Sequence, residues 1–173
     1  MKAASALIKI VIPQYRMHTR VFDNVLNGIK DKDAGVRVEG RTNHILWMTG
    51  NLVNCRYWLG DILGLDHKDP HEALFKDAKA LDPNAEYPSI DTLKKEWHKI
   101  SAPVYERLLA VTEKELDEAY PFGMNVGFVE ENRLNMVGMA MDRESYLFGQ
   151  LGLMRRILGY EGMKYDMDET IPY

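Results

Sequence analysis

One charged residue interrupts an otherwise apolar helical stripe. In the segment 133–158, Arg143 shares a predicted helix face with residues at three- and four-residue steps, namely Met136, Ala140, Leu147, Leu151, Met154 and Leu158. A guanidinium stays charged in proteins, so a buried one needs an anion or several hydrogen-bond acceptors. Two interpretations follow. Arg143 either recognises an anion inside a central pocket, or it forms a structural ion pair or extends out to solvent.

The cysteine and the histidines give weaker chemical signals. Cys55, the single cysteine, falls on an apolar stripe, and this predicts a buried, unreactive thiol. His67 and His71 have the spacing that places two imidazoles on one helix face. However, Pro70 lies between them, and no third metal ligand is evident. We therefore predict a solvated loop there and no metal site.

Four segments with a helical period must position these residues. Each repeats apolar residues at three- and four-residue steps, as the second does with Ile45, Met48, Leu52, Cys55, Leu59 and Ile62. The predicted helices span residues 8–29, 43–63, 90–119 and 133–158. Residues 65–88, with a short helix at 71–75, and residues 120–132 form the longer connections. Long connections alternating with short ones fit a four-helix bundle with crossovers.

Residues that favour helix ends support these limits. We predict Asn43 as the N-cap of the second helix and Gly64 as its stop. Ser89 or Asp91 is expected to cap the third helix. Pro103 should kink that helix, because proline removes a backbone donor and crowds the preceding turn.

The composition bounds the class of protein. A chain of 173 residues fits one domain with one core, predicted to span 1–173. The formal net charge is −4 and no basic face is evident, which argues against a nucleic-acid partner. No segment approaches the roughly 18 apolar residues of a membrane span, so we expect no membrane association. The single cysteine suits a reducing, cytoplasmic location.

Two motifs together resemble the DinB/YfiT-like superfamily. Residues 43–52 read NHILWMTGNL, similar to the family's second-helix motif, and residues 143–156 read RESYLFGQLGLMRR, similar to its fourth-helix motif. Residues 87–89, followed by Trp97, are similar to the family's entry to the third helix. The resemblance implies an all-α fold, a four-helix bundle of DinB/YfiT-like type with long crossover connections. It also implies frequent dimerisation and a divalent metal held by three histidines.

The family's metal positions are altered in this chain. In register with the family's motifs, the three histidine positions hold Asn51, Arg143 and Leu147. Arg143 would repel a metal ion, and His44 lies about 10 Å along the helix from Asn51, too far to substitute. The resemblance therefore implies a domain without metal or other cofactor. Its former metal cavity would be lined by Asn51, Arg143, Glu144 and Leu147 and would bind a small anionic ligand.

The function that follows is a small-molecule-binding or structural module rather than an enzyme, with no catalytic residue identified. The alternative is a DinB-like enzyme, either a metal-dependent hydrolase with displaced ligands such as His18 or His44, or a thiol-dependent transferase. In a metal-free transferase, Arg143 would bind an anionic cosubstrate. A homodimer is expected, because the resemblance implies one and wide apolar stripes can be buried against a second copy.

Overall fold

The computed structural model describes residues 3–77, 79–123, 126–166, 169–171 and 173. Four long helices form its body: α1 (Val11–Leu26), α3 (Ile45–Ile62), α4 (Ile90–Ala110) and α6 (Arg133–Ile157). Short helical turns lie in the connections: α2 (Asp31–Ala34), η1 (Val38–Gly40), η2 (Glu72–Leu74) and α5 (Glu113–Leu116). The predicted all-α class is confirmed, since the only extended pairing in these ranges is an isolated bridge between Ala119 and Asn132.

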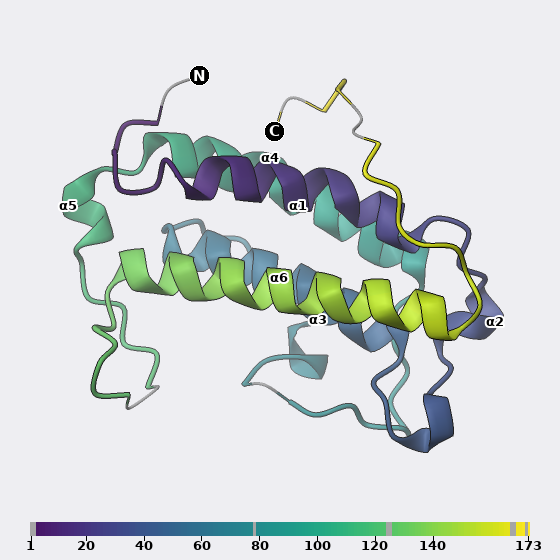
Figure 1. Ribbon diagram of the computed structural model, residues 1–173. Helices are drawn as coiled ribbons and strands as arrows, with labels where there is room; N and C mark the ends of the chain where they lie inside the picture. The colour runs from purple at the N-terminus through teal and green to yellow at the C-terminus, as the bar shows by residue number, and fades with distance from the viewer. Residues whose placement is uncertain (1–2, 78, 124–125, 167–168, 172) are drawn as a thin grey trace.

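The four long helices pack in two layers (Figure 1). α1 lies beside α4, and α6 lies beside α3. The main contacts join α3 to α6 and α4, and α1 to α6 and α4, so each long helix has two main neighbours. The side chains between them are apolar and include Phe22, Leu52, Trp97 and Leu147. Within the described ranges, none of the helices is both long and apolar enough to cross a bilayer.

The start of α3 differs from the prediction by one residue. His44, not Asn43, is its N-cap, and the Nδ1 of His44 accepts a hydrogen bond from the backbone N–H of Trp47 at 2.9 Å. An unprotonated ring nitrogen can accept this bond as an asparagine oxygen would. The predicted stop is confirmed, because Gly64 follows the helix with a φ of +85°, a region that favours glycine.

The third predicted helix is shorter than expected. α4 begins after Ser89, whose side chain caps it as one of the two predicted candidates, and it continues through Pro103. It ends at Ala110, well before the predicted limit. The reason is local, because Thr112 and Glu115 form a reciprocal capping box that starts the separate helix α5.

Two connecting segments lie on the same side of the molecule. In Figure 1, the connection after α3 and the one between α5 and α6 both extend from the α3–α6 layer, away from α1 and α4. The short helix predicted at 71–75 is a single turn, η2. These segments wall the cleft described below.

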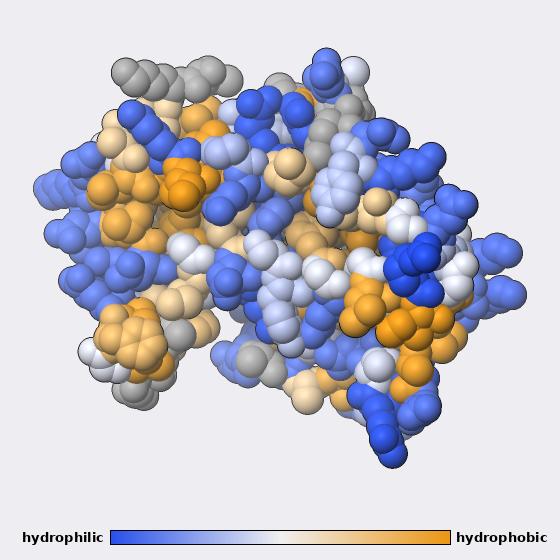
Figure 2. All heavy atoms as spheres, viewed as in Figure 1, coloured by the Kyte–Doolittle hydropathy of each residue, from blue (hydrophilic) through white to orange (hydrophobic). Residues whose placement is uncertain are grey.

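Apolar side chains also gather on the surface over the C-terminal end of α6 (Figure 2). Leu153 and Ile157 are 63% and 50% exposed there, and we call this pair the α6 apolar patch. The two residues are four apart, so they lie on the same helix face and form one continuous contact area.

Candidate functional site

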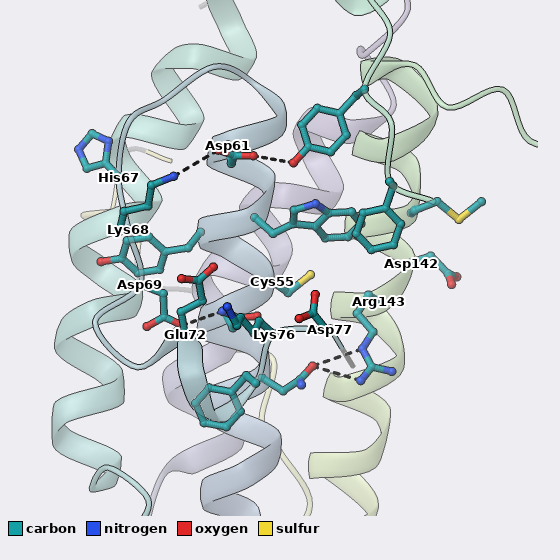
Figure 3. A pocket seen from close by; sticks show the side chains of 18 of the residues that line it. Cys55, Asp61, His67, Lys68, Asp69, Glu72, Lys76, Asp77, Asp142 and Arg143 are labelled. Atoms are coloured by element: carbon teal, nitrogen blue, oxygen red, sulfur yellow. Dashed lines mark hydrogen bonds and ion pairs between the residues drawn. The ribbon is translucent and has the colours of Figure 1, made fainter. Parts of the chain in front are cut away.

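A cleft of about 1110 Å³ opens on the outer side of α3 and α6. Its walls come from both helices, from the connection 67–77 and from residues 120–122. Figure 3 shows side chains from all of these segments pointing into it. The cleft therefore lies where α3 and α6 run side by side.

Arg143 and Asn51 meet at one end of this cleft (Figure 3). The Nε and Nη2 of Arg143 lie 3.3 and 3.2 Å from Asn51 Oδ1 and donate hydrogen bonds to it. The guanidinium carbon lies 5.3 Å from the centre of the Tyr146 ring, within the range of a cation–π contact. Arg143 is half-buried and Asn51 is buried. The structure thus brings together two of the residues singled out in the sequence, at a cleft wall rather than in the centre of the core.

The other two residues of the predicted cavity lie elsewhere. Glu144 and Leu147 are fully buried, and neither lines the cleft. Successive residues of an α-helix point about 100° apart, so Arg143 can face the cleft while Glu144 faces the interior. Leu147 belongs to the apolar core. The expectation that these four residues line one cavity is therefore corrected, because they divide between the cleft and the core.

The described cleft walls carry more carboxylates than cations. The acidic residues are Asp61, Asp69, Glu72, Asp77 and Asp142, and the basic ones are Lys68, Lys76 and Arg143. At the end away from Arg143, Asp61 lies 3.7 Å from Lys68 and accepts a hydrogen bond from the Tyr120 hydroxyl at 2.6 Å (Figure 3). Burial raises the pKa of Asp69 above its usual value. In Figure 3, Asp77 and Asp142 lie near Arg143, so carboxylates line the cleft at both ends.

Cys55 lines the cleft but does not present a reactive thiol. It is buried, and its Sγ donates a hydrogen bond to the Ala140 carbonyl oxygen at 3.3 Å. Burial raises the pKa of its thiol well above the usual value, and the Glu144 carboxylate raises it further. The thiolate is the nucleophilic form, so the geometry agrees with the prediction of an unreactive cysteine.

A buried ion pair that the sequence reading missed joins α3 to α6. Arg56 Nε and Nη2 donate to the two oxygens of Glu144 at 2.7 and 2.8 Å, and both side chains are fully buried. Arg56 Nη1 also reaches Thr19 Oγ1 at 2.9 Å and Ser101 Oγ at 3.2 Å. The Glu144 carboxylate therefore has its partner on another helix, and not in the neighbouring Arg143.

Aromatic rings complete the surroundings of Arg56. Its guanidinium carbon lies 3.9 Å from the ring centres of both Tyr15 and Trp97. Burial alone would raise the pKa of Glu144, but Arg56 and His18 hold it below its usual value. Burial also raises the pKa of Tyr15 to about 12. The pair is therefore charged, while the tyrosine beside it stays neutral.

The sequence does contain a signal for Arg56. The 18 residues of α3 hold only Arg56 and Asp61 as charged side chains, and apolar residues lie all around the helix. A helix that is apolar on every side is buried on every side. Such a helix predicts that a charge in its middle lies in the core with a partner, whereas a search for one apolar stripe overlooks it.

The histidines have separate local roles. His18 Nδ1 lies 2.9 Å from Glu144 Oε2, and His44 caps α3. His67 is exposed and His71 half-buried in the connection after α3. Within the described ranges, no group of three or more histidine, cysteine, aspartate or glutamate side chains is placed to hold a metal ion.

No protein-family model and no curated protein matches this chain. Its own structure defines an all-α protein with a cleft beside α3 and α6 and a buried arginine–carboxylate pair behind that cleft. The function is therefore argued from the chain's own residues.

Proposed function

We propose that the chain is a metal-free four-helix bundle of DinB/YfiT-like type that binds a small anionic molecule in the α3–α6 cleft. The motifs that resemble the family lie on α3 and α6, which contact each other extensively. Asn51 and Arg143, which occupy two of the family's metal positions, are hydrogen-bonded to each other. The guanidinium would supply the positive charge that a metal supplies in the family.

The observation that carries the proposal is the neutral partner of Arg143. Its acceptor among the described residues is the carboxamide of Asn51, whereas the buried Arg56 has a bidentate carboxylate. A guanidinium has five N–H donors, and two of them serve Asn51. Arg143 therefore retains an unneutralised charge and free N–H donors that an anion in the cleft can use. Hydrogen bonds between a guanidinium and an anion are stronger than those between neutral groups.

The charge of the cleft narrows the class of anion. Carboxylates line the cleft at both ends, with Asp61 and Asp69 away from Arg143 and Asp77 and Asp142 nearer to it. They would repel a molecule with several negative charges. A molecule with a single carboxylate fits this distribution of charge, and so does a zwitterion whose amine faces one of the cleft carboxylates. We therefore infer a small carboxylate ligand and disfavour polyphosphates.

Ligand-induced stabilisation of the full chain tests the proposal. Acetate, glycine, malonate and inorganic phosphate would each be titrated while two quantities are followed. These are the melting temperature and the intrinsic tryptophan fluorescence, to which the cleft residue Trp58 contributes. We expect a monocarboxylate or zwitterion to raise the melting temperature, because binding to the native state stabilises it. Arg143→Met should abolish the rise. Arg156→Met is the matched control, since Arg156 is an exposed arginine at the far end of α6.

Two results would contradict the proposal. One is a wild-type protein whose melting temperature and tryptophan fluorescence respond to none of the four compounds. The other is a response of equal size in Arg143→Met and in the wild type, since the ligand would then bind elsewhere.

A further inference from the structure

Three polar side chains form a hydrogen-bonded row from the surface into the core. Ser145 Oγ lies 3.2 Å from His18 Nε2, and His18 Nδ1 lies 2.9 Å from Glu144 Oε2. Ser145 is exposed, the His18 side chain is 12% exposed, and Glu144 is fully buried. A hydroxyl, an imidazole and a carboxylate therefore follow one another inward from solvent.

Glu144 determines which nitrogen of His18 carries the hydrogen. An ionised carboxylate can only accept, so the ring hydrogen lies on Nδ1, and Nε2 of the neutral ring is an acceptor beside Ser145 Oγ. Arg56 keeps the carboxylate in place through its bidentate contact. The Phe148 ring, 5.2 Å from the His18 ring centre, packs against the imidazole. Ser145 Oγ also donates a hydrogen bond to the Met141 carbonyl oxygen at 3.1 Å. Its single hydrogen therefore has to turn from that carbonyl to Nε2 before the imidazole can remove it from the hydroxyl nucleophile.

A second, apolar pocket of about 510 Å³ opens at this row. Besides His18 and Ser145, its lining includes Val21, Gly149 and Gly152, and no lysine, arginine or carboxylate is among the described residues that line it. A Cβ built at either glycine meets open space. The pocket therefore fits an uncharged apolar group next to the Ser145 hydroxyl.

We propose that Ser145 is a nucleophile that takes the acyl group of uncharged aryl esters, with His18 as its general base and Glu144 as the positioning residue. Ser145 Oγ forms a bond to the ester carbonyl carbon while its proton passes to His18 Nε2. The bond to the phenolic oxygen then breaks, and the phenolate takes that proton. Water repeats the sequence on the acyl-serine, and the carboxylic acid leaves.

The position of Ser145 sets the class of ester. Ser145 lies inside α6, where the backbone N–H groups are committed to the helix and cannot stabilise an oxyanion. A phenolate leaves readily, so aryl esters depend less on such stabilisation than alkyl esters do. The apolar pocket accommodates a short acyl chain.

Hydrolysis of p-nitrophenyl butyrate by the full chain, with labelling by a fluorophosphonate, tests this site. We expect a burst approaching one p-nitrophenol per chain and a fluorophosphonate adduct on Ser145 in the mass spectrum. Ser145→Ala should remove both. His18→Asn, whose side-chain amide can take the place of Nδ1 and donate to Glu144, should slow acylation about 100-fold, the usual scale of general-base catalysis.

A variant that fills the second pocket distinguishes catalysis at this site from unspecific reaction of the ester with the protein. Gly149→Leu should lower the acylation rate at least as much as His18→Asn does, because the new side chain occupies the acyl site. Gly138→Leu, at an exposed helical glycine with open space around it, is the matched control and should react as the wild type does. An undiminished burst in Ser145→Ala or Gly149→Leu would overturn the proposal. So would an adduct on another residue in place of Ser145, or no burst in the wild type.

Discussion

The bidentate contact between Arg56 and Glu144 joins α3 to α6 through the core, with N–O distances of 2.7 and 2.8 Å and no solvent exposure of either side chain. Such a pair stabilises a fold little relative to apolar residues of equal volume. Losing one member is costly, because a charge then remains buried without its partner. The free energy of unfolding should therefore fall when one of the two residues is replaced, and much less when both are replaced by apolar residues.

Glu144→Gln should destabilise the protein by about 3–5 kcal/mol, because Arg56 keeps its buried charge and loses its counter-ion. Urea unfolding monitored by circular dichroism measures this change. Asp142→Asn, at an exposed carboxylate of the same helix, is the control and should change stability by less than about 0.5 kcal/mol. The double variant Arg56→Met with Glu144→Met should recover much of the loss. A Glu144→Gln protein as stable as the wild type would show that the pair does not act as described.

The cap of α3 should make stability depend on pH. Burial and the Arg37 charge lower the pKa of His44 from its ordinary value of 6.5, although its own backbone raises it. Its unfolded pKa is therefore higher than its folded pKa. The cap's contribution is complete above the unfolded value and is lost as pH falls through the lower folded value.

Comparison of unfolding at pH 7.5 and pH 5 checks this expectation. The wild type should lose more stability on acidification than His44→Asn, because asparagine caps a helix at both pH values. Since the other histidines are common to both proteins, the difference isolates residue 44. Equal losses in the two proteins would contradict the assigned role of His44.

The spacing of apolar residues and the residues that favour helix ends made the long helices predictable. Apolar residues at three- and four-residue steps locate α3 and α6 to within two residues, and Gly64 and Ser89 mark ends that the structure confirms. The early end of α4 was missed because the capping box at Thr112 is a local signal inside a continuing apolar pattern. At this position the hydrogen bonds of the capping box end the helix, although the spacing of apolar residues continues.

Contacts between helices were less accessible to sequence reasoning. The proximity of Arg143 to Asn51 is expected from the proposed DinB/YfiT-like resemblance, and the two side chains are hydrogen-bonded. The rows through Arg56 and His18 depend on how far each helix is rotated about its axis. A single stripe per helix does not give that rotation, so Glu144 was assigned to the cleft although it faces the core.

Metal should neither copurify with this protein nor stabilise it. In the proposed DinB/YfiT-like assignment, Asn51, Arg143 and Leu147 would replace the metal-binding histidines, and a guanidinium repels cations. Protein prepared without chelator should contain no stoichiometric zinc, nickel or iron, and each added ion should leave the melting temperature unchanged. Elemental analysis that finds one equivalent of a bound metal would instead favour the alternative of an enzyme with displaced ligands.

The α6 apolar patch should form part of a homodimer interface. Leu153 and Ile157 expose large side chains on one helix face, and a second copy could cover them. We expect a dimer by sedimentation velocity at micromolar concentration, and Leu153→Lys should shift it to monomer. Leu7→Lys, at a leucine 50% exposed near α1, is the control and should remain dimeric. A wild type that sediments only as monomer would rule out this interface.

Arg143→Met should leave stability within about 1 kcal/mol of the wild type, in contrast to the loss expected for Glu144→Gln. Arg143 is half-buried, and its acceptor is the neutral amide of Asn51, so its removal leaves no charge unpaired in the core. Methionine preserves most of the apolar stem. Urea unfolding of both variants under one set of conditions gives the comparison. A loss of 3–5 kcal/mol, the scale of a broken buried pair, would mean that Arg143 balances an internal charge and is not held ready for a ligand.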